Sequence, residues 1–287
     1  MKITNVTATV LRLPQISSAA DGTQDDLIIT VETDEGITGY GEVDTAPYVG
    51  KAVVDAYMSH GTCYGLREVV VGSDPFDYEQ IWNDMWAKTY YYGRSGPVMH
   101  VMSGIDMAIW DIMGKAVGKP VHKLLGGSYA DKVRAYASAL MPDTPDEVKK
   151  MTEKYVSLGY TAIKFGWGPL GYDVHYDIEL IKTARKAAGD KVDVMIDIGK
   201  RYRLKEAIYV AKALEQLNIY WLEEPLPAED YIGYKRLTES TTMRIATGEE
   251  ESGRLAFARL INETHIDVVQ PDMSRCGGLT EAKKISM

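Results

Sequence analysis

The feature that most constrains the fold is a strand-and-helix rhythm in the second half of the chain, after Asp131. Short apolar runs recur there, and each is followed by a stretch with the apolar spacing of an amphipathic helix. Repeated units of this kind predict a parallel sheet covered by helices, either a (β/α)-barrel or a doubly wound sheet. The expected strands are residues 133–137, 162–165, 194–198, 221–223, 244–247 and 268–270, and the expected helices include 145–158, 178–189 and 204–217.

Two observations favour the barrel. Polar residues cluster at the C-terminal ends of successive strands, where barrel enzymes keep their active sites, and no glycine-rich nucleotide loop follows the first strand. The visible strands stop short of a full barrel before Met287, and an open barrel exposes an apolar seam and two strand edges. We therefore expect an α/β fold with a TIM-like (β/α) barrel truncated after about the sixth strand. Either the chain is a fragment, or something else covers the gap.

The first part of the chain follows a different pattern. Apolar and polar residues alternate from Ile3 to Val10 and again over 27–33 and 35–42, which predicts three short antiparallel strands. From about residue 48 the spacing becomes helical, and glycines near residue 126 supply a helix stop. We expect an α+β domain over residues 1–127 and an incomplete barrel domain over residues 128–287.

Composition narrows the classes of partner and the compartment. The formal net charge is −9 and no block of Lys and Arg occurs, so a nucleic-acid partner is not expected. No apolar run reaches membrane-spanning length, and the N-terminus has the alternation of a strand and not the pattern of a signal peptide. Cys63 and Cys276 are the two cysteines, which suits a reducing compartment. We expect a cytoplasmic protein without a membrane partner.

Three acidic residues stand at equivalent points of consecutive units: Asp197 in MIDIG, Glu223 in WLEEP and Glu249 in TGEE. Successive members are 26 residues apart, which suits one strand-helix repeat, so their carboxylates are expected to converge at one end of the sheet. Converging carboxylates repel one another unless a cation joins them, and Mg²⁺ binds carboxylate and water oxygens. One such acid alone is as readily a helix N-cap, but three in register predict a Mg²⁺ site. The adjacent Glu224 and Glu250 stay alternatives, because register is inferred from pattern alone.

Two further charged residues are expected at the same end of the sheet. Lys164, in AIKFGWG, ends a strand one unit before the three acids, so it can bind a substrate carboxylate or act as a base if its pKa is depressed. Asp272, in VVQPDMSRCGG, follows the last strand and can orient a catalytic histidine. Each residue has a structural alternative, a strand-end lysine that reaches solvent and a turn-forming aspartate.

These motifs resemble those of a known family. The segments GIDMAIWDIMGK (104–115) and GKPVHKLLGG (118–127) resemble the junction between capping domain and barrel in the enolase superfamily. The strand ends MIDIG, WLEEPLP, TGEE and QPDMSRCGGLTE resemble those of the mandelate racemase subgroup. The resemblance covers essentially the whole chain, in the family's order and spacing.

The resemblance implies roles for the residues already singled out. Asp197, Glu223 and Glu249 would bind Mg²⁺, which holds the substrate carboxylate and stabilises the enediolate formed when the α-proton leaves. Lys164 matches the first lysine of a catalytic Lys-x-Lys motif, Asp272 matches the acid of an Asp-His dyad, and Lys164 and Glu249 would contact substrate. Segments near 21–26 and 46–50 correspond to capping loops that select the substrate. The family also implies a homo-oligomer.

The sequence departs from the family at several positions. Gly166 replaces the second lysine, so a two-base racemisation loses one partner, and Gly199 replaces an Asn that commonly contacts substrate. The dyad histidine would belong to a seventh strand. His265 begins the last strand and is expected at the opposite, structural end of the barrel, whereas His175 is a minor candidate for acid/base chemistry.

The leading hypothesis is a hydro-lyase that dehydrates a sugar acid to a 2-keto-3-deoxy acid, because one base suffices for β-elimination. A cycloisomerase, epimerase or racemase of the same superfamily is the first alternative. A non-catalytic, metal-binding remnant of the fold is the second. A nucleotide-binding doubly wound protein is disfavoured because the G-x-G-x-x-G turn is missing.

Overall fold

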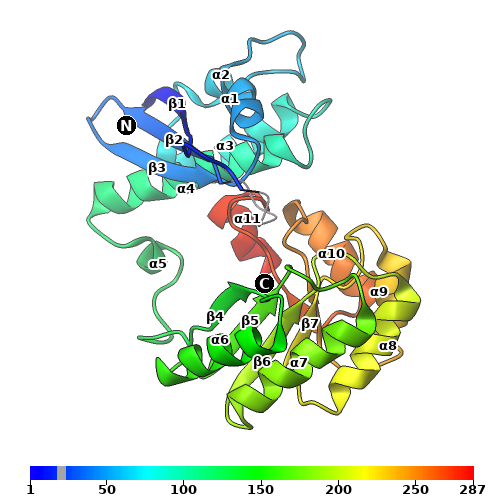
Figure 1. Ribbon diagram of the computed structural model, residues 1–287. Helices are drawn as coiled ribbons and strands as arrows, with labels where there is room; N and C mark the ends of the chain where they lie inside the picture. Colours follow the sequence, from blue (N-terminus) through cyan, green and yellow to red (C-terminus); the bar gives the residue numbers. More distant parts are fainter. Residues whose placement is uncertain (18–23) are drawn as a thin grey trace.

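The computed structural model describes residues 1–17 and 24–287 (Figure 1). Its N-terminal part is an α+β unit in which the predicted antiparallel strands pair in the order β1-β2-β3. Helix α4 packs across this sheet. The elements are β1 (Ile3–Leu11), β2 (Asp26–Thr33), β3 (Thr38–Val43), α1 (Pro47–Asp55), α2 (Leu66–Val70), η1 (Pro75–Asp77), α3 (Tyr78–Lys88), α4 (Pro97–Val117) and α5 (Val121–Leu124).

The second part is a six-stranded parallel sheet in which neighbours in sequence are neighbours in space, in the order β4-β5-β6-β7-β8-β9. A helix follows each strand, as the strand-and-helix rhythm predicts, and β4 and β9 are the edge strands. The elements are β4 (Ala137–Leu140), α6 (Pro145–Ser157), β5 (Ala162–Gly166), α7 (Val174–Ala188), β6 (Asp193–Asp197), α8 (Leu204–Glu215), β7 (Trp221–Glu223), α9 (Tyr231–Thr238), β8 (Ile245–Thr247), α10 (Gly253–Thr264), β9 (Val268–Val269) and α11 (Gly278–Ile285).

The prediction of a strand at 133–137 is wrong, because β4 begins only at Ala137. Val133 is 91% exposed and offers no apolar face to the sheet. Arg134 instead ties this segment to the starts of the next two strands, since it donates to Thr161 and pairs with Asp193 at 2.6 Å. Side-chain contacts hold the segment in place without strand pairing.

Two hydrophobic clusters fill the two parts, one around the N-terminal sheet and α4 and one around the parallel sheet. Along the described ranges 1–17 and 24–287, no helix is both long and apolar enough to cross a membrane. The domain boundary at 127/128 stays a prediction.

Helix α11 lies between the two parts (Figure 1) and is fixed to α4 by buried hydrogen bonds. Asp106 of α4 accepts from the backbone N–H of Thr280 at 2.9 Å and from its hydroxyl at 2.6 Å. Trp110 donates to the same hydroxyl at 2.9 Å, and Trp82 donates to the carbonyl of Gly277 at 2.9 Å. These contacts fix the chain that follows β9, where Asp272 lies, against the N-terminal part.

Candidate active site

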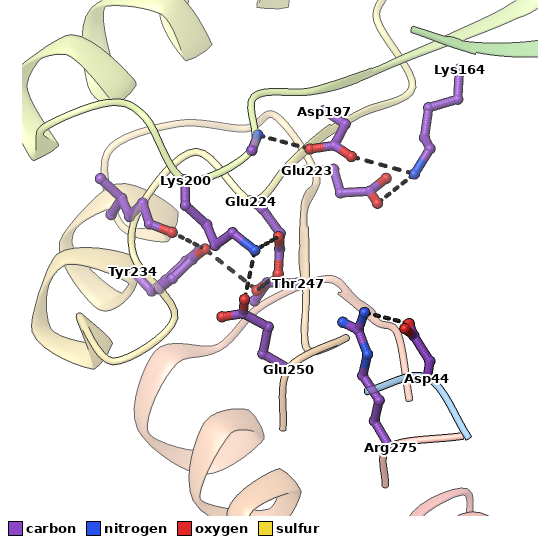
Figure 2. A network of polar contacts seen from close by, with 12 residues as sticks. Asp44, Lys164, Asp197, Lys200, Glu223, Glu224, Tyr234, Thr247, Glu250 and Arg275 are labelled. Carbon is purple, nitrogen blue, oxygen red and sulfur yellow. Dashed lines mark hydrogen bonds and ion pairs between the residues drawn. The ribbon is translucent and has the colours of Figure 1, made fainter. Parts of the chain in front are cut away.

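A lysine and two carboxylates meet at the C-terminal ends of three neighbouring strands. Asp197 on β6 is the register partner of Glu223 on β7 and of Gly166 on β5, two residues after Lys164. The Nζ of Lys164 lies 2.6 Å from Oε1 of Glu223 and 3.6 Å from Oδ2 of Asp197 (Figure 2). Parallel pairing therefore brings together side chains from positions 164, 197 and 223, as their strand-end positions predict.

Burial and mutual repulsion shape the electrostatics of this cluster. Burial, together with the charge of Glu223, raises the pKa of Asp197 to about 6, although Lys164 opposes the rise. Burial alone would lower the pKa of Lys164, but Glu223 and Asp197 outweigh burial and raise it. Lys164 is therefore held as an ammonium ion.

The third predicted ligand, Glu249, follows strand β8. Its charge contributes to the raised pKa of Asp197, so the two carboxylates lie within electrostatic range of each other. Across residues 1–17 and 24–287, no group of three His, Cys, Asp or Glu side chains is arranged closely enough to hold a metal ion. The donor set itself consists of carboxylate oxygens, which suits a hard divalent cation such as Mg²⁺.

The alternative carboxylates, Glu224 and Glu250, belong to a second cluster (Figure 2). Both pair with Lys200, whose Nζ lies 3.2 Å from Oε2 of Glu224 and 2.7 Å from Oε1 of Glu250. Glu224 is buried, and Thr247 lies beside its carboxylate at 3.5 Å. Burial and the charge of Glu249 raise the pKa of Glu224, while Lys200 lowers it. Lys164 thus contacts the carboxylates at positions 197 and 223, and Lys200 contacts those at positions 224 and 250.

The two glycines that depart from the family pattern occupy crowded positions. A Cβ at Gly166 would lie 2.8 Å from the Cβ of Asp197, closer than side chains approach each other. Gly199 has a φ of +63° and its Cβ would lie 2.8 Å from the Trp167 ring, so a side chain there is both strained and obstructed. The missing lysine and asparagine are therefore consistent with the packing of this chain.

The remaining predicted site residues are placed as follows. Asp272 accepts from the backbone N–H and the hydroxyl of Ser274 at 2.7 and 2.6 Å, and both residues line a pocket with Asp44 of the N-terminal part. His265 is exposed at the C-terminus of α10, before β9, at the end of the sheet opposite the carboxylates, as predicted. His175 packs edge-to-face on Tyr209, between α7 and α8, and so contacts helices at the periphery of the sheet.

One of the two predicted capping loops is a helix, and the other lies partly outside the described residues. The expectation of a loop at 46–50 is wrong, because Pro47 begins helix α1 there and its ring fixes a φ suited to the first helical turn. The segment 21–26 lies partly outside the described residues. Within the described part, Asp25 accepts from Arg12 at 3.2 Å and Asp26 begins β2.

The structure adds residues that the sequence reasoning missed. Arg275 forms an ion pair with Asp44, which joins the loop after β9 to the end of β3. His100 on α4 is half-buried near them, and burial followed by the charge of Arg275 lowers its pKa. Its Nδ1 has no hydrogen-bond partner in the described part of the chain. These residues are far apart in sequence, and no local motif marks them.

Comparison with known proteins identifies the family. Residues 2–126 match the family described as mandelate racemase / muconate lactonizing enzyme, N-terminal domain, and residues 146–287 match the enolase C-terminal domain-like family. The chain belongs to the enolase superfamily, in its mandelate racemase subgroup. The resemblance inferred from the strand-end motifs is confirmed.

Two relatives are sugar-acid dehydratases by name. The L-rhamnonate dehydratase of Saccharopolyspora erythraea is 33% identical over 262 residues, which cover 91% of this chain and 63% of that protein. The D-galactonate dehydratase of Pectobacterium atrosepticum is 34% identical over 269 residues, which cover 91% of this chain and 67% of that protein. The chain therefore spans about two thirds of the length of these relatives.

Solved structures share the fold. The 3,6-anhydro-D-galactonate cycloisomerase from Zobellia galactanivorans is similar with a TM-score of 0.88 and 34% identity, over 100% of this chain and 76% of that chain. A racemase from Streptomyces coelicolor A3(2) with bound magnesium is similar with a TM-score of 0.87 and 28% identity, over 99% of this chain and 79% of that chain.

Proposed function

We propose that this chain carries the active site of a Mg²⁺-dependent dehydratase acting on a sugar acid. The observation that supports the proposal most strongly is the cluster of Lys164, Asp197 and Glu223 at adjacent strand ends. Two relatives named as dehydratases of rhamnonate and galactonate support the substrate class. The related racemase with bound magnesium supports the choice of metal.

Three carboxylates would hold the metal, those of Asp197, Glu223 and Glu249. Mg²⁺ would supply concentrated positive charge beside the substrate carboxylate and so make the weakly acidic α-proton removable. Lys164 already points at two of these carboxylates, Asp197 and Glu223, and its side chain is only 13% exposed. We propose that it turns to a substrate carboxylate oxygen, which carries the same charge as the groups it now contacts.

The reaction balances without an external oxidant. A base takes the C2 proton and the electron pair of the C2–H bond forms the C2–C3 double bond, while the C3–O bond breaks and the hydroxyl, protonated by an acid, leaves as water. The resulting enol then tautomerises to the 2-keto-3-deoxy acid. Asp272 keeps its proposed role of orienting the base, and its contacts with Ser274 hold the carboxylate in one position.

The proposal also covers the barrel fold, the oligomeric state, the cellular location and the domain boundary. The TM-score of 0.88 over the whole chain supports a (β/α) barrel for the sheet β4 to β9, in which further strands would pair with the edges of β4 and β9. We also propose a homo-oligomer, and a cytoplasmic location that suits the free thiols of Cys63 and Cys276. The division at 127/128 is proposed as the domain boundary.

The test is a library of sugar acids incubated with the protein and Mg²⁺, with 2-keto acid products trapped by semicarbazide. Turnover is expected in the wild-type protein and not in Glu223→Gln. Glu229→Gln is the matched control, because Glu229 is an exposed glutamate that follows the same strand. Full activity in Glu223→Gln would contradict the assignment. Mg²⁺ binding without exchange of any substrate α-proton with D₂O would favour the non-catalytic alternative.

A second reaction is supported by one observation, the similarity to a cycloisomerase of an anhydro sugar acid. Such an enzyme begins with the same α-proton removal but closes or opens a ring without losing water. The products separate the two reactions. A 2-keto-3-deoxy acid supports the dehydratase, and an isomer of unchanged mass supports the cycloisomerase.

A further inference from the structure

Trp221 stands two residues before Glu223 on strand β7, and both side chains lie on the same face of the sheet. Residues two apart in a strand point to one face, and the register places Met195 beside Trp221 and Asp197 beside Glu223. Nε1 of the Trp221 indole donates to Oε2 of Glu223 at 2.8 Å. An aromatic side chain of the strand itself therefore contacts a carboxylate of the proposed metal site.

The two oxygens of Glu223 have different partners. Oε1 lies 2.6 Å from the ammonium group of Lys164 (Figure 2), whereas Oε2 accepts the indole N–H. Glu223 is only 1% exposed, so solvent water has little access to replace either donor. A carboxylate that turns about its last bond exchanges its two oxygens, and such a turn would break the hydrogen bond from Trp221. The indole N–H therefore determines which oxygen of Glu223 faces the positive charge.

Asp197 shows the same arrangement with a different donor. Its Oδ1 accepts from the backbone N–H of Gly199 at 2.9 Å, and its Oδ2 lies 3.6 Å from Nζ of Lys164. In both carboxylates, an uncharged N–H group holds one oxygen and the other oxygen faces a cation. The indole and the amide only donate and carry no charge, so they orient each carboxylate without neutralising it.

The indole of Trp221 is itself held by two neighbouring rings. The Tyr136 ring meets it edge-to-face, with centroids 5.9 Å apart and an interplanar angle of 87°. The Tyr220 ring lies 5.4 Å away at an angle of 56°. Moving the indole away from Glu223 would break these contacts as well as the hydrogen bond. The direction of its N–H is therefore set by packing, as the orientation of a buried aromatic side chain usually is.

We propose that Trp221 is a positioning residue that holds the Glu223 carboxylate with Oε1 turned toward the metal ion. The inference rests on the proposed function, because it takes Glu223 as a Mg²⁺ ligand. Groups that hydrogen-bond to metal ligands orient them, and loss of such a group typically weakens metal binding about 10- to 100-fold. Trp221→Phe keeps an aromatic ring against Tyr136 but has no N–H, so it separates the hydrogen bond from the packing.

The first measurement is calorimetric titration of Mg²⁺ into wild type, Trp221→Phe and the control Trp86→Phe. Trp86 is a matched control because its half-buried indole stacks on Trp82 within helix α3 of the N-terminal part, 5.8 Å between ring centroids. We expect Trp221→Phe to bind Mg²⁺ about 10- to 100-fold more weakly than wild type. Trp86→Phe is expected to keep the wild-type affinity.

The second measurement follows the indole N–H signals by nuclear magnetic resonance in protein labelled with ¹⁵N-tryptophan. The signal of Trp221 is assigned by its loss in Trp221→Phe. We expect this signal to move when Mg²⁺ saturates the wild type. It should also move in Glu223→Gln without added metal, because the charged acceptor of the N–H is gone. A ring that only fills space would keep its signal in Glu223→Gln.

Two results overturn the inference: wild-type Mg²⁺ affinity in Trp221→Phe, or a Trp221 signal that stays in place in Glu223→Gln. If Trp221→Phe does not fold, the signal is assigned by elimination and its response to Glu223→Gln and to Mg²⁺ decides. The Phe variants used for the elimination are those of Trp82, Trp86, Trp110 and Trp167. A wild-type protein that binds no Mg²⁺ contradicts the proposed function and the inference together, whereas unchanged binding in Trp221→Phe contradicts the inference alone.

Discussion

Asp106→Asn tests the buried joint between the N-terminal part and helix α11. Asp106 is 1% exposed and accepts two hydrogen bonds from Thr280. Burial raises its pKa from 3.8 to about 7, although the hydrogen bonds from Thr280 oppose the rise. The folded protein therefore keeps a proton on this carboxyl at pH values where the unfolded chain has lost it.

The sign of the pH dependence follows from this difference. Between pH 4 and pH 7 the unfolded state ionises at Asp106 while the folded state does not, so the free energy of unfolding of the wild type falls as the pH rises. The difference between 3.8 and about 7, at about 1.4 kcal/mol per pKa unit, gives a loss of up to about 4 kcal/mol. Above pH 7 both states are ionised, and the loss is complete.

Asparagine cannot ionise, so the variant escapes this loss. Its amide oxygen can still accept from the N–H of Thr280, but one acceptor is gone, at a cost of about 1 kcal/mol. We expect Asp106→Asn and wild type to be about equally stable at pH 4.5, where the wild type has already lost about 1 kcal/mol, and the variant to be more stable by about 3 kcal/mol at pH 8. The difference between the two proteins should grow by about 3 kcal/mol from pH 4.5 to pH 8.

The assay is urea unfolding at pH 4.5, 6 and 8, followed by tryptophan fluorescence. Trp82 and Trp110 are suitable reporters, because both donate hydrogen bonds to the segment that carries α11. Asp84→Asn on the neighbouring helix α3 removes a carboxylate that is not buried and serves as the control. A difference between Asp106→Asn and wild type that stays constant across the three pH values would refute the reasoning.

Three further perturbations test other contacts. Gly166→Ala is expected to push Asp197 aside, because the added Cβ would lie 2.8 Å from the Cβ of Asp197. Calorimetry should then show Mg²⁺ binding that is at least tenfold weaker. An unchanged affinity would contradict this expectation. Arg275→Met should destabilise the protein by about 1 kcal/mol in urea unfolding, because it leaves Asp44 without its partly buried partner, and Arg275→Lys should recover part of the loss. Mg²⁺ at one hundred times its dissociation constant should add about 2.7 kcal/mol to the free energy of unfolding. Removal of Mg²⁺ by EDTA should reverse the gain. A melting temperature that responds to neither reagent would argue against a metal site.

Much of the parallel sheet follows from the sequence, because its strands are short buried runs that end in polar residues. The periodicity predicts β5 to β9 to within a few residues, and parallel pairing then carries Asp197 and Glu223 to one end of the sheet. Lys164 is predicted by the same reasoning. The first strand is misplaced because Val133, Ala135 and Tyr136 are apolar in sequence but exposed, and β4 has a partner on only one side.

The contacts made by loops could not be predicted in this way. Lys200 pairs with Glu224 and Glu250 across loops in which Lys200 and Glu224 adopt positive φ values, which a lysine and a glutamate do not signal in sequence. The ion pair of Arg275 with Asp44 joins residues 231 positions apart, and its formation depends on how α11 docks on α4. Sequence pattern specifies strand ends, whereas these pairings depend on the packing of the two parts.

The most direct test of the central claim is calorimetric titration of Mg²⁺ into wild type, Asp197→Asn, Glu223→Gln, Glu249→Gln and the control Glu229→Gln, each verified as folded. The proposed site predicts saturable binding to wild type and to the control, and at least tenfold weaker binding to each of the three ligand variants. Binding of Mg²⁺ with wild-type affinity by all three variants would contradict the proposed site.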